Sequence, residues 1–176
     1  MILRPATPAD VPALARLGRD SFVATFGDLY RPEDLAAFLE AVHSEPAVLE
    51  EVNGEECRYR LAEAEGELIG YCKLRYPGSF AGRSDARNPI TLGQLYTAPG
   101  STGRGIGTAL MDWAIGEALA LGCDAIQLSV YAENFGAQRF YQRYGFAKIA
   151  DITFQVGDHV DPEFLYELRL DQEKML

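Results

Sequence analysis

The chain has 176 residues, of which 48% are hydrophobic, and it carries 26 acidic against 16 basic residues, for a formal net charge of −10. This length and composition indicate one globular domain with a buried core, and no stretch approaches the ~20 apolar residues that a membrane span requires. The negative charge argues against nucleic acid and anionic membranes as partners, because like charges repel. It is compatible with a cationic substrate, and equally with an acidic surface that only maintains solubility.

The N-terminus and the cysteines predict a cytoplasmic protein. The first ten residues, MILRPATPAD, contain neither the basic segment nor the apolar segment of an export signal. Cys57, Cys72 and Cys123 are an odd number without metal-binding spacing. We therefore expect buried, reduced thiols and no metal site.

Hydrophobic periodicity and capping signals predict the elements of the N-terminal half. In chain order they are a strand at residues 2–4, a helix from the N-cap Thr7 to about Gly18 or somewhat beyond, an aromatic-rich connection at residues 21–30, a helix that opens at residues 31–34, a further helix that ends at Asn53 and Gly54, and a hairpin of strands 59–63 and 68–74. The loop that follows, residues 77–89, exceeds the usual ~4–6 residues, which marks it as flexible or functional.

Strands and helices are also predicted in the C-terminal half. Its predicted elements are a strand at residues 90–97, a helix at 106–121, a buried parallel strand at 125–131, a short helix at 137–144, and strands at 146–154 and 163–170 that are joined through residues 156–162. The sequence contains no repeat, linker or low-complexity tract.

A glycine-rich turn lies between the strand at residues 90–97 and the helix that follows it. It reads STGRGIG over residues 101–107. The first N–H groups of a helix lack acceptors and carry about half a unit of positive charge, so a turn with few side chains lets phosphate oxygens reach them. We interpret the segment as a pyrophosphate-binding turn, and the alternative is a glycine turn with a purely structural role.

Spacing separates the phosphate-binding motifs that compete for this turn. A Walker loop needs Gly-Lys-Ser/Thr, but Ile106 and Gly107 follow Gly105, so this motif is ruled out. The dinucleotide fingerprint fits poorly, because its third glycine comes one place early and Asp124 precedes the next strand instead of ending it.

Two motifs together resemble the GNAT superfamily of N-acyltransferases. The first is LYTAP at residues 95–99 followed by GRGIG at residues 103–107, which is similar to the acyl-CoA-binding motif of that family. The second is NFGAQRFYQRYGF at residues 134–146, which is similar to the family's short helix with a tyrosine beside the cofactor sulfur. The resemblance covers roughly residues 2–170 and implies a single N-acetyltransferase domain over residues 1–176.

This resemblance implies a mixed central sheet, antiparallel in its N-terminal half and with a splayed parallel pair in the middle, flanked by helices. The implied cofactor is acetyl-CoA, whose pantetheine arm fills the gap between the splayed strands. The motifs assign cofactor binding to Leu95, Tyr96, Thr97, Thr102, Gly103, Arg104, Gly105, Ile106, Gly107, Thr108, Asn134, Ala137 and Tyr141. Relatives usually have arginine or glutamine at the position of Thr102, so we expect Arg104 to supply the missing charge.

The implied chemistry is transfer of an acetyl group to a primary amine. Tyr141 occupies the position from which relatives protonate the departing sulfur, and the alternative is a tyrosine that only packs in the core. Many relatives place a glutamate base near residue 94, but this chain has Gln94, whose amide cannot accept a proton at neutral pH. The groups that remain as candidates for the base, with no choice among them, are Glu63, Glu133, Asp151, Asp158 and His159.

The acceptor remains the least defined part. In the family the helix-loop-helix region after the first strand forms one wall of the acceptor pocket, which makes Phe22, Phe26 and Tyr30 pocket candidates, although at least one of them is expected only to pack the helices onto the sheet. Residues 25–30, 130–134 and 153–158 are similar to a bacterial subgroup that includes polyamine acetyltransferases. The resemblance therefore implies a small polyamine-like amine or a peptide amine as substrate.

One alternative comes from a different functional class, and one question concerns assembly. Gln94 in place of a glutamate is compatible with a non-catalytic sensor that binds acyl-CoA, whereas Tyr141 favours an enzyme. Exposed edge strands of the predicted sheet are compatible with a homodimer.

Overall fold

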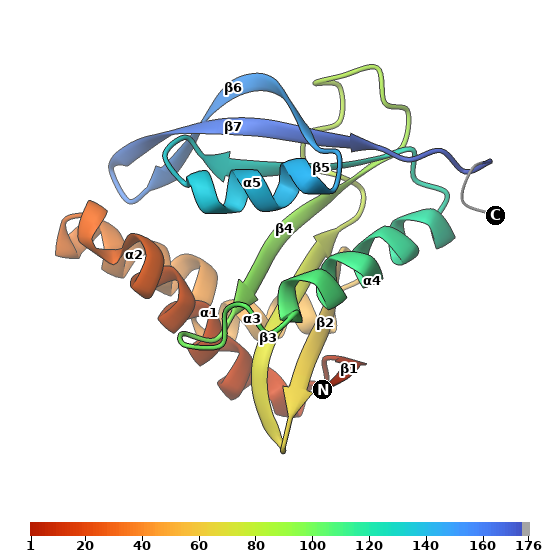
Figure 1. Ribbon diagram of the computed structural model, residues 1–176. Coiled ribbons are helices and arrows are strands. Elements are labelled where there is room, and N and C mark those ends of the chain that lie inside the picture. Colours follow the sequence, from red (N-terminus) through yellow and green to blue (C-terminus); the bar gives the residue numbers. More distant parts are fainter. Residues whose placement is uncertain (174–176) are drawn as a thin grey trace.

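A computed structural model describes residues 1–173, which form a seven-stranded sheet with helices on both faces (Figure 1). The strands are β1 (Ile2–Pro5), β2 (Cys57–Ala64), β3 (Glu67–Arg75), β4 (Pro89–Thr97), β5 (Ala125–Tyr131), β6 (Ala147–Val156) and β7 (His159–Arg169). The helices are α1 (Val11–Phe26), α2 (Pro32–His43), α3 (Glu45–Asn53), α4 (Ile106–Ala120) and α5 (Phe135–Arg143). Short 3₁₀ turns at Pro8–Asp10 and Gly27–Leu29 precede and follow α1.

The strand order is β1-β2-β3-β4-β5-β7-β6, and every neighbouring pair is antiparallel except β4 and β5. The parallel pairing is short, because it joins only residues 89–91 of β4 to residues 125–127 of β5. Beyond these residues β4 stays on β3 and β5 stays on β7, so that the two halves of the sheet diverge into a V (Figure 1). This arrangement confirms the mixed α/β sheet with a splayed parallel pair that the sequence resemblance implied.

A β-bulge in β4 lies where the two halves separate. Leu74 of β3 pairs with Leu92, but the preceding Lys73 pairs with Gln94, so that Gly93 is an extra residue in β4. A bulge bends its strand and increases the local twist. β4 therefore turns away from β5 directly after the last parallel pair.

Separate hydrophobic clusters hold the helices on the two faces of the sheet. α4 packs on one face through fully buried side chains such as Leu110 and Ala114. α1 and α3 pack on the other face through Leu14 and Val48. A third cluster joins α1 and α2 to the end of β6, and its buried members are Phe22, Phe38 and Val156.

α1 ends at Phe26, well past the end that we predicted near Gly18, so the first part of the connection expected at residues 21–30 is helical. Gly18 serves close packing instead of ending the helix. A Cβ atom at this position would lie 2.5 Å from Nδ1 of His43 and 2.8 Å from Oη of Tyr71, and both of these side chains are buried. A glycine is therefore required here by the small space between α1, His43 and Tyr71.

β6 and β7 form a longer hairpin than the sequence predicted. Val156 pairs with His159, so the chain reverses at Gly157 and Asp158 and not through the whole of residues 156–162. Gly157 has a φ of +59°, which suits glycine, and the N–H of Asp158 donates a 2.9 Å hydrogen bond to Oδ1 of Asp34 in α2. This contact anchors the hairpin tip on α2, and residues 159–162 become part of a paired strand.

Two smaller expectations also need correction. The short helix α5 begins at Phe135, two residues before the predicted start, because the side chain of Asn134 caps it by accepting a 3.3 Å hydrogen bond from the N–H of Ala137.

All three cysteines are free, but only Cys72 and Cys123 are buried. Cys57 is half-buried, since it is the first residue of β2 at an end of the sheet.

The space around Gly18 gives a prediction about stability. Replacing a glycine by alanine inside a helix usually stabilises a protein by up to about 1 kcal/mol. We expect that gain for Gly116→Ala in α4, where an added Cβ meets nothing within 4 Å. Gly18→Ala should instead destabilise the fold by about 1–3 kcal/mol, because the new methyl group displaces His43 and Tyr71. Urea unfolding of both variants measures the two effects, and a gain of stability in Gly18→Ala would contradict this packing.

Candidate active site

The gap between the diverging halves of the sheet opens into a cavity of about 460 Å³. β4 and β5 border it in the middle, and α1 and α2 contribute a wall of aromatic side chains. α5, the loop between β3 and β4, and the β6–β7 hairpin complete its lining. The cavity thus collects residues from both halves of the chain at the point where the parallel pairing stops.

The glycine turn lies between the end of β4 and the start of α4 (Figure 1). Gly105 is the N-cap of α4 in the left-handed region, with a φ of +75°, and Gly103 has a φ of +79°. A Cβ at either position would meet nothing within 4 Å. The turn is therefore free of neighbouring side chains, and the first N–H groups of α4 have no helical acceptor. This open, positively polarised turn fits an anionic group such as a pyrophosphate.

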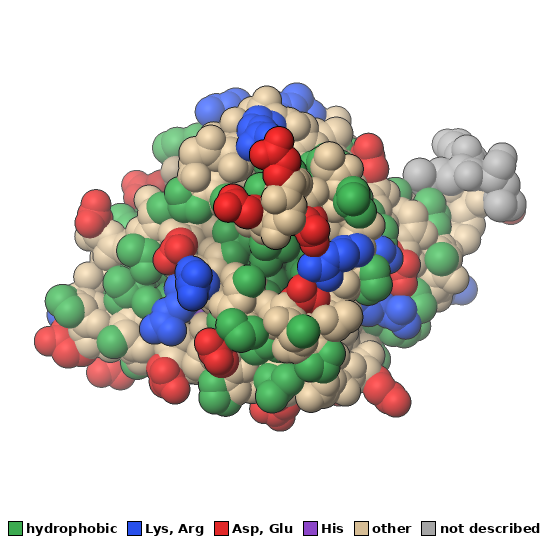
Figure 2. Space-filling model, turned by 90° about the horizontal axis from the view of Figure 1, so that it is seen from below, with side chains coloured by type: hydrophobic (Ala, Val, Ile, Leu, Met, Phe, Trp, Pro, Cys, Tyr) green, Lys and Arg blue, Asp and Glu red, His purple; other side chains and the backbone are tan. Residues whose placement is uncertain are grey.

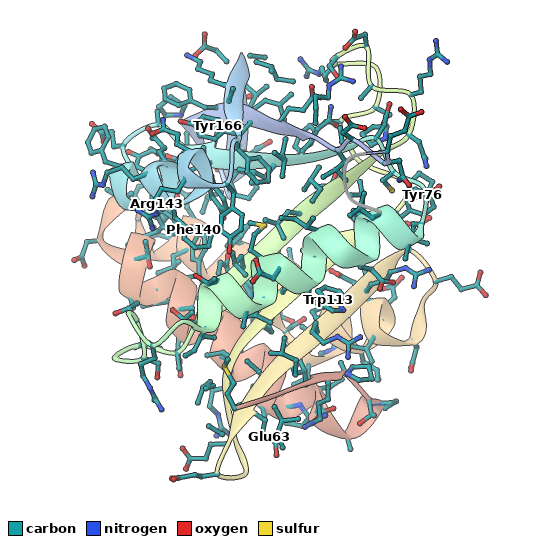
Figure 3. All side chains as sticks on the ribbon, turned by 45° about the vertical axis from the view of Figure 1, so that its right-hand side comes forward. Glu63, Tyr76, Trp113, Phe140, Arg143 and Tyr166 are labelled. Atoms are coloured by element: carbon teal, nitrogen blue, oxygen red, sulfur yellow. The ribbon has the colours of Figure 1, made fainter. Side chains whose placement is uncertain are left out.

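α5 packs against the beginning of α4 and places Tyr141. The ring of Phe140 lies 3.6 Å from the position of a Cβ on Gly107, and Figure 3 shows Phe140 between the two helices. Oη of Tyr144 donates a 3.3 Å hydrogen bond to the carbonyl of Thr108. The ring of Tyr141, held against Phe140, lines the cavity. Burial raises the pKa of the Tyr141 phenol, so it carries its proton at neutral pH.

The end of β4 borders the cavity along an edge on which no strand is paired. Leu95, Tyr96 and Thr97 pair with β3 on one side only, since the parallel pairing with β5 ends at Thr91. The carbonyl of Thr97 accepts a 3.1 Å hydrogen bond from Oγ of Ser21, so this group is not free. Leu95 and Tyr96 line the cavity, as do Asn134 and Ala137 at the start of α5. Leu95, Tyr96, Asn134 and Ala137, all predicted to bind the cofactor, therefore lie around the same cavity. Residues 102–108 lie in the glycine turn and at the start of α4.

The three predicted pocket residues form one side of the cavity. Phe22, Phe26 and Tyr30 all line it. The ring centroid of Phe22 lies 5.2 Å from that of Phe26 and 5.9 Å from that of Tyr30. Phe22 also packs on Phe38 at 4.5 Å and is buried, so it joins the helices to each other as well as bordering the cavity. Phe26 meets Tyr131 of β5 edge to face at 6.0 Å.

Two carboxyl groups in the cavity were missed by the sequence analysis, and both are in β7. Asp161 accepts a hydrogen bond from Oη of Tyr30, and its Oδ1 lies 2.9 Å from Nε2 of His159. Glu163 is only 9% exposed, and its Oε2 makes no direct hydrogen bond within residues 1–173, although the hydroxyl of Ser129 lies nearby. Burial, followed by the negative charge of Asp161, raises the pKa of Glu163 to about 7. The alternation of a strand would have placed Asp161 and Glu163 on one face, had the strand been predicted to start at His159.

The groups that the sequence offered as bases lie elsewhere. Within the described part of the chain, none of Glu63, Glu133, Asp151, Asp158 and His159 lines the cavity. Glu63 is paired with Arg4 at 2.7 Å, and Asp151 is exposed beside Lys148. Gln94 does line the cavity, and its Oε1 accepts a 2.7 Å hydrogen bond from Oη of Tyr71.

Three further observations concern surface charge, metal binding and membrane spans. Figure 2 shows acidic side chains spread over one face of the molecule, with fewer basic side chains between them. Residues 1–173 contain no group of three or more His, Cys, Asp or Glu side chains arranged to hold a metal ion. None of the helices in this part of the chain is both long enough and apolar enough to cross a membrane.

Comparison with known proteins gives consistent matches. The model of the Acetyltransferase (GNAT) family matches residues 19–146. The chain is 27% identical over 161 residues to an uncharacterized N-acetyltransferase in the pepI 3′ region of Lactobacillus delbrueckii subsp. lactis, and the match covers 92% of each chain.

Two solved structures share the fold. One is the PaiA N-acetyltransferase from Thermoplasma acidophilum in complex with coenzyme A, with a TM-score of 0.79 and 22% identity over 96% of this chain and 98% of that chain. The other is NAA60 of Arabidopsis thaliana in complex with a bisubstrate analogue, with a TM-score of 0.74 and 18% identity over 97% of this chain and 98% of that chain. At these identities the likeness is one of fold.

The buried carboxyl group of Glu163 predicts a stability effect that depends on pH. Its pKa rises from 4.5 to about 7 on folding. Below pH 4 the carboxyl group is neutral in both the folded and the unfolded state. As the pH rises, it ionises first in the unfolded chain, so the free energy of unfolding falls by up to about 3 kcal/mol above pH 7. Glu163→Gln, which stays neutral, should therefore raise the unfolding temperature at pH 8 and leave it nearly unchanged at pH 4. The exposed Glu50→Gln is the control, and a lower unfolding temperature for Glu163→Gln at pH 8 would contradict the burial of this charge.

Proposed function

The chain belongs to the GNAT family of acetyltransferases, and on this premise we propose that it transfers an acetyl group from acetyl-CoA to the primary amine of a polyamine-like small molecule or a peptide. The observation that carries the proposal is the splayed pair of β4 and β5, since the gap between these strands opens into an acidic and aromatic cavity. The glycine turn that follows β4 supports the proposal as a candidate site for an anion. Both substrates then meet in the gap of the sheet, and the amine attacks directly in a ternary complex.

The residues around the gap fit acetyl-CoA. The N–H groups of the turn would hold the pyrophosphate, with the charge of Arg104 beside them, and the free edge of β4 would hydrogen-bond the pantetheine arm. When bound, acetyl-CoA supplies an activated acyl group as a thioester. The positions that we assign to its binding are Leu95, Tyr96, Thr97, Thr102, Gly103, Arg104, Gly105, Ile106, Gly107, Thr108, Asn134, Ala137 and Tyr141.

The side chains and backbone at the gap divide the chemistry between them. A backbone N–H of β4 polarises the acyl carbonyl and stabilises the negative charge that develops on its oxygen. Tyr141, which holds its proton at neutral pH, donates it to the departing sulfur. Both groups act from fixed elements, since β4 is held by β3 and α5 is held by α4.

The composition of the cavity supports an amine that carries a positive charge. The aromatic rings of Phe22, Phe26 and Tyr30 offer faces to which an ammonium group is attracted. Asp161 and Glu163 add carboxyl groups at the same cavity, and the net charge of −10 attracts cations to the protein as a whole. A polyamine-like amine and the amino terminus of a peptide both meet this description.

Location and assembly are part of the same proposal. We place the protein in the cytoplasm, which the three free cysteines support. We also propose a homodimer, which is supported by the unpaired outer edges of β1 and β6, because such edges are surfaces on which a second copy can add.

The direct test is incubation with acetyl-CoA and a panel of amines, followed by measurement of free thiol. We expect thiol release above background with alkyl polyamines or short peptides that have a free amino terminus. Mass spectrometry of the product should show one added acetyl group on nitrogen. If the protein binds acetyl-CoA by calorimetry but releases no thiol with any amine, a non-catalytic acyl-CoA sensor would replace this proposal.

Tyr141→Phe tests the assignment of the general acid. This change keeps the ring and its packing on Phe140 but removes the hydroxyl group, and general acid catalysis contributes roughly 10²–10⁴ in rate. We therefore expect acetyl-CoA affinity to change little while turnover at saturation falls at least about ten-fold. An acyl donor with a more acidic thiol should recover part of the loss. Turnover close to that of the parent protein would make Tyr141 a packing residue.

A further inference from the structure

The groups assigned so far leave the proton of the attacking amine without an acceptor. An alkylamine with a pKa of ~10.4 is neutral in only roughly one molecule in 10³ at pH 7. Gln94 faces the cavity, but its amide is not basic, and its Oε1 already accepts a hydrogen bond from Tyr71. The acceptor must therefore be another group that lines the cavity.

The titratable groups that face the cavity can be compared one by one. Those within residues 1–173 are Tyr30, Lys73, Tyr96, Tyr131, Tyr141, Asp161 and Glu163. The pKa of each of the four tyrosines is raised, so these phenols hold their protons at neutral pH. Lys73 is a cation whose Nζ lies 2.9 Å from Oε2 of Glu51. Asp161 is engaged by Tyr30 and by His159. Glu163 is the carboxyl group that remains.

The position of Glu163 suits a proton acceptor. It lies in β7 opposite Tyr131 of β5, and its Oε2 makes no direct hydrogen bond within residues 1–173. The hydroxyl of Ser129, which also lacks a partner, lies close enough to act against the rise in the pKa of Glu163. Glu163 and Tyr141, the phenol that protonates the sulfur, line the same cavity. A group that takes a proton and a group that gives one therefore border the same gap.

We propose that Glu163 accepts the proton of the acceptor amine and that the cavity selects amines that are cations at neutral pH. This inference rests on the proposed function. The carboxylate takes one proton from the ammonium, the freed lone pair forms the N–C bond to the acetyl carbon, and the C–S bond breaks as Tyr141 gives its proton to the sulfur. The proton that the nitrogen loses after bond formation restores the phenol. Glu163 releases its proton to water, so that one proton leaves per acetyl group transferred.

The charges around Glu163 explain why a bound ammonium substrate favours the ionised form of its carboxyl group. Asp161 on the same strand disfavours a second negative charge, and burial does so more strongly. An ammonium group in the cavity neutralises this repulsion and stabilises the ionised carboxylate. An amine that is already neutral needs no acceptor before it attacks. The contribution of Glu163 should therefore depend on the pKa of the acceptor.

The experiment compares two acceptors and three proteins. The acceptors are a short primary alkylamine and its β,β,β-trifluorinated analogue, whose amine is neutral at pH 7.5. The proteins are the parent, Glu163→Gln, and Glu50→Gln as an exposed control on α3, outside the cavity. We expect Glu163→Gln to lose about 10²-fold or more in kcat/KM with the alkylamine and less than about five-fold with the fluorinated amine. Glu50→Gln should match the parent with both.

The pH profile gives a second readout. With the alkylamine, kcat/KM of the parent should rise with pH and flatten above about 7, where Glu163 is ionised. In Glu163→Gln the rate should continue to rise about ten-fold per pH unit, because only the neutral amine reacts. The parent profile needs no variant, so it decides the question even if Glu163→Gln does not fold. A parent profile that rises without a break to pH 9 would overturn the assignment.

The outcomes separate the two proposals. A parent protein that acetylates no amine overturns the proposed function and this inference with it. If the parent is active but kcat/KM of Glu163→Gln falls equally with both amines, or falls with neither, the role of Glu163 alone is overturned. Acetyl-CoA affinity measured by calorimetry should be unchanged in the variant, because Glu163 lies on the acceptor side of the gap.

Discussion

The short parallel pairing of β4 with β5 is the constraint on which the site depends. Hydrogen bonds join the two strands over only three residue pairs, and the bulge at Gly93 then bends β4 away. If β4 and β5 were paired along their whole length, the backbone groups of residues 95–97 would bond within the sheet and no cavity would remain. The gap instead exposes those groups, and α4, α5 and the aromatic wall are all arranged around it. The edge of β4 that faces away from β3 thus has no partner strand at the proposed binding site.

The two sides of this gap differ in chemistry because different faces of the sheet supply them. The face covered by α4 and α5 offers helix N–H groups, a glycine turn and the phenol of Tyr141. The face covered by α1 and α2 offers aromatic rings and two buried carboxyl groups. In the proposed function, the positive end of α4 faces the anionic donor, and the carboxyl groups face a cationic acceptor.

Local signals in the sequence predicted the cofactor side better than the acceptor side. The glycine turn and the helix after it depend on residues close together in the chain, and the structure places both where the sequence indicated. Glu163 depends on where a hairpin reverses, which is decided by a contact between Asp158 and Asp34, 124 residues apart. Gly18 depends on the distant side chains of His43 and Tyr71. Tertiary contacts of this kind leave no local trace, so the strand start and the helix end were both misplaced.

The division of the site between two faces also bears on how such a protein can diversify. α1, α2 and the β6–β7 tip meet through side chains such as Phe22 and Phe38, and none of these contacts passes through the glycine turn. Substitutions in that cluster can reshape the acceptor cavity while the donor half keeps its geometry. Duplicated copies of such a gene are therefore free to drift toward new amines without first losing the ability to hold the acyl donor. The architecture makes acceptor choice an independently evolvable trait.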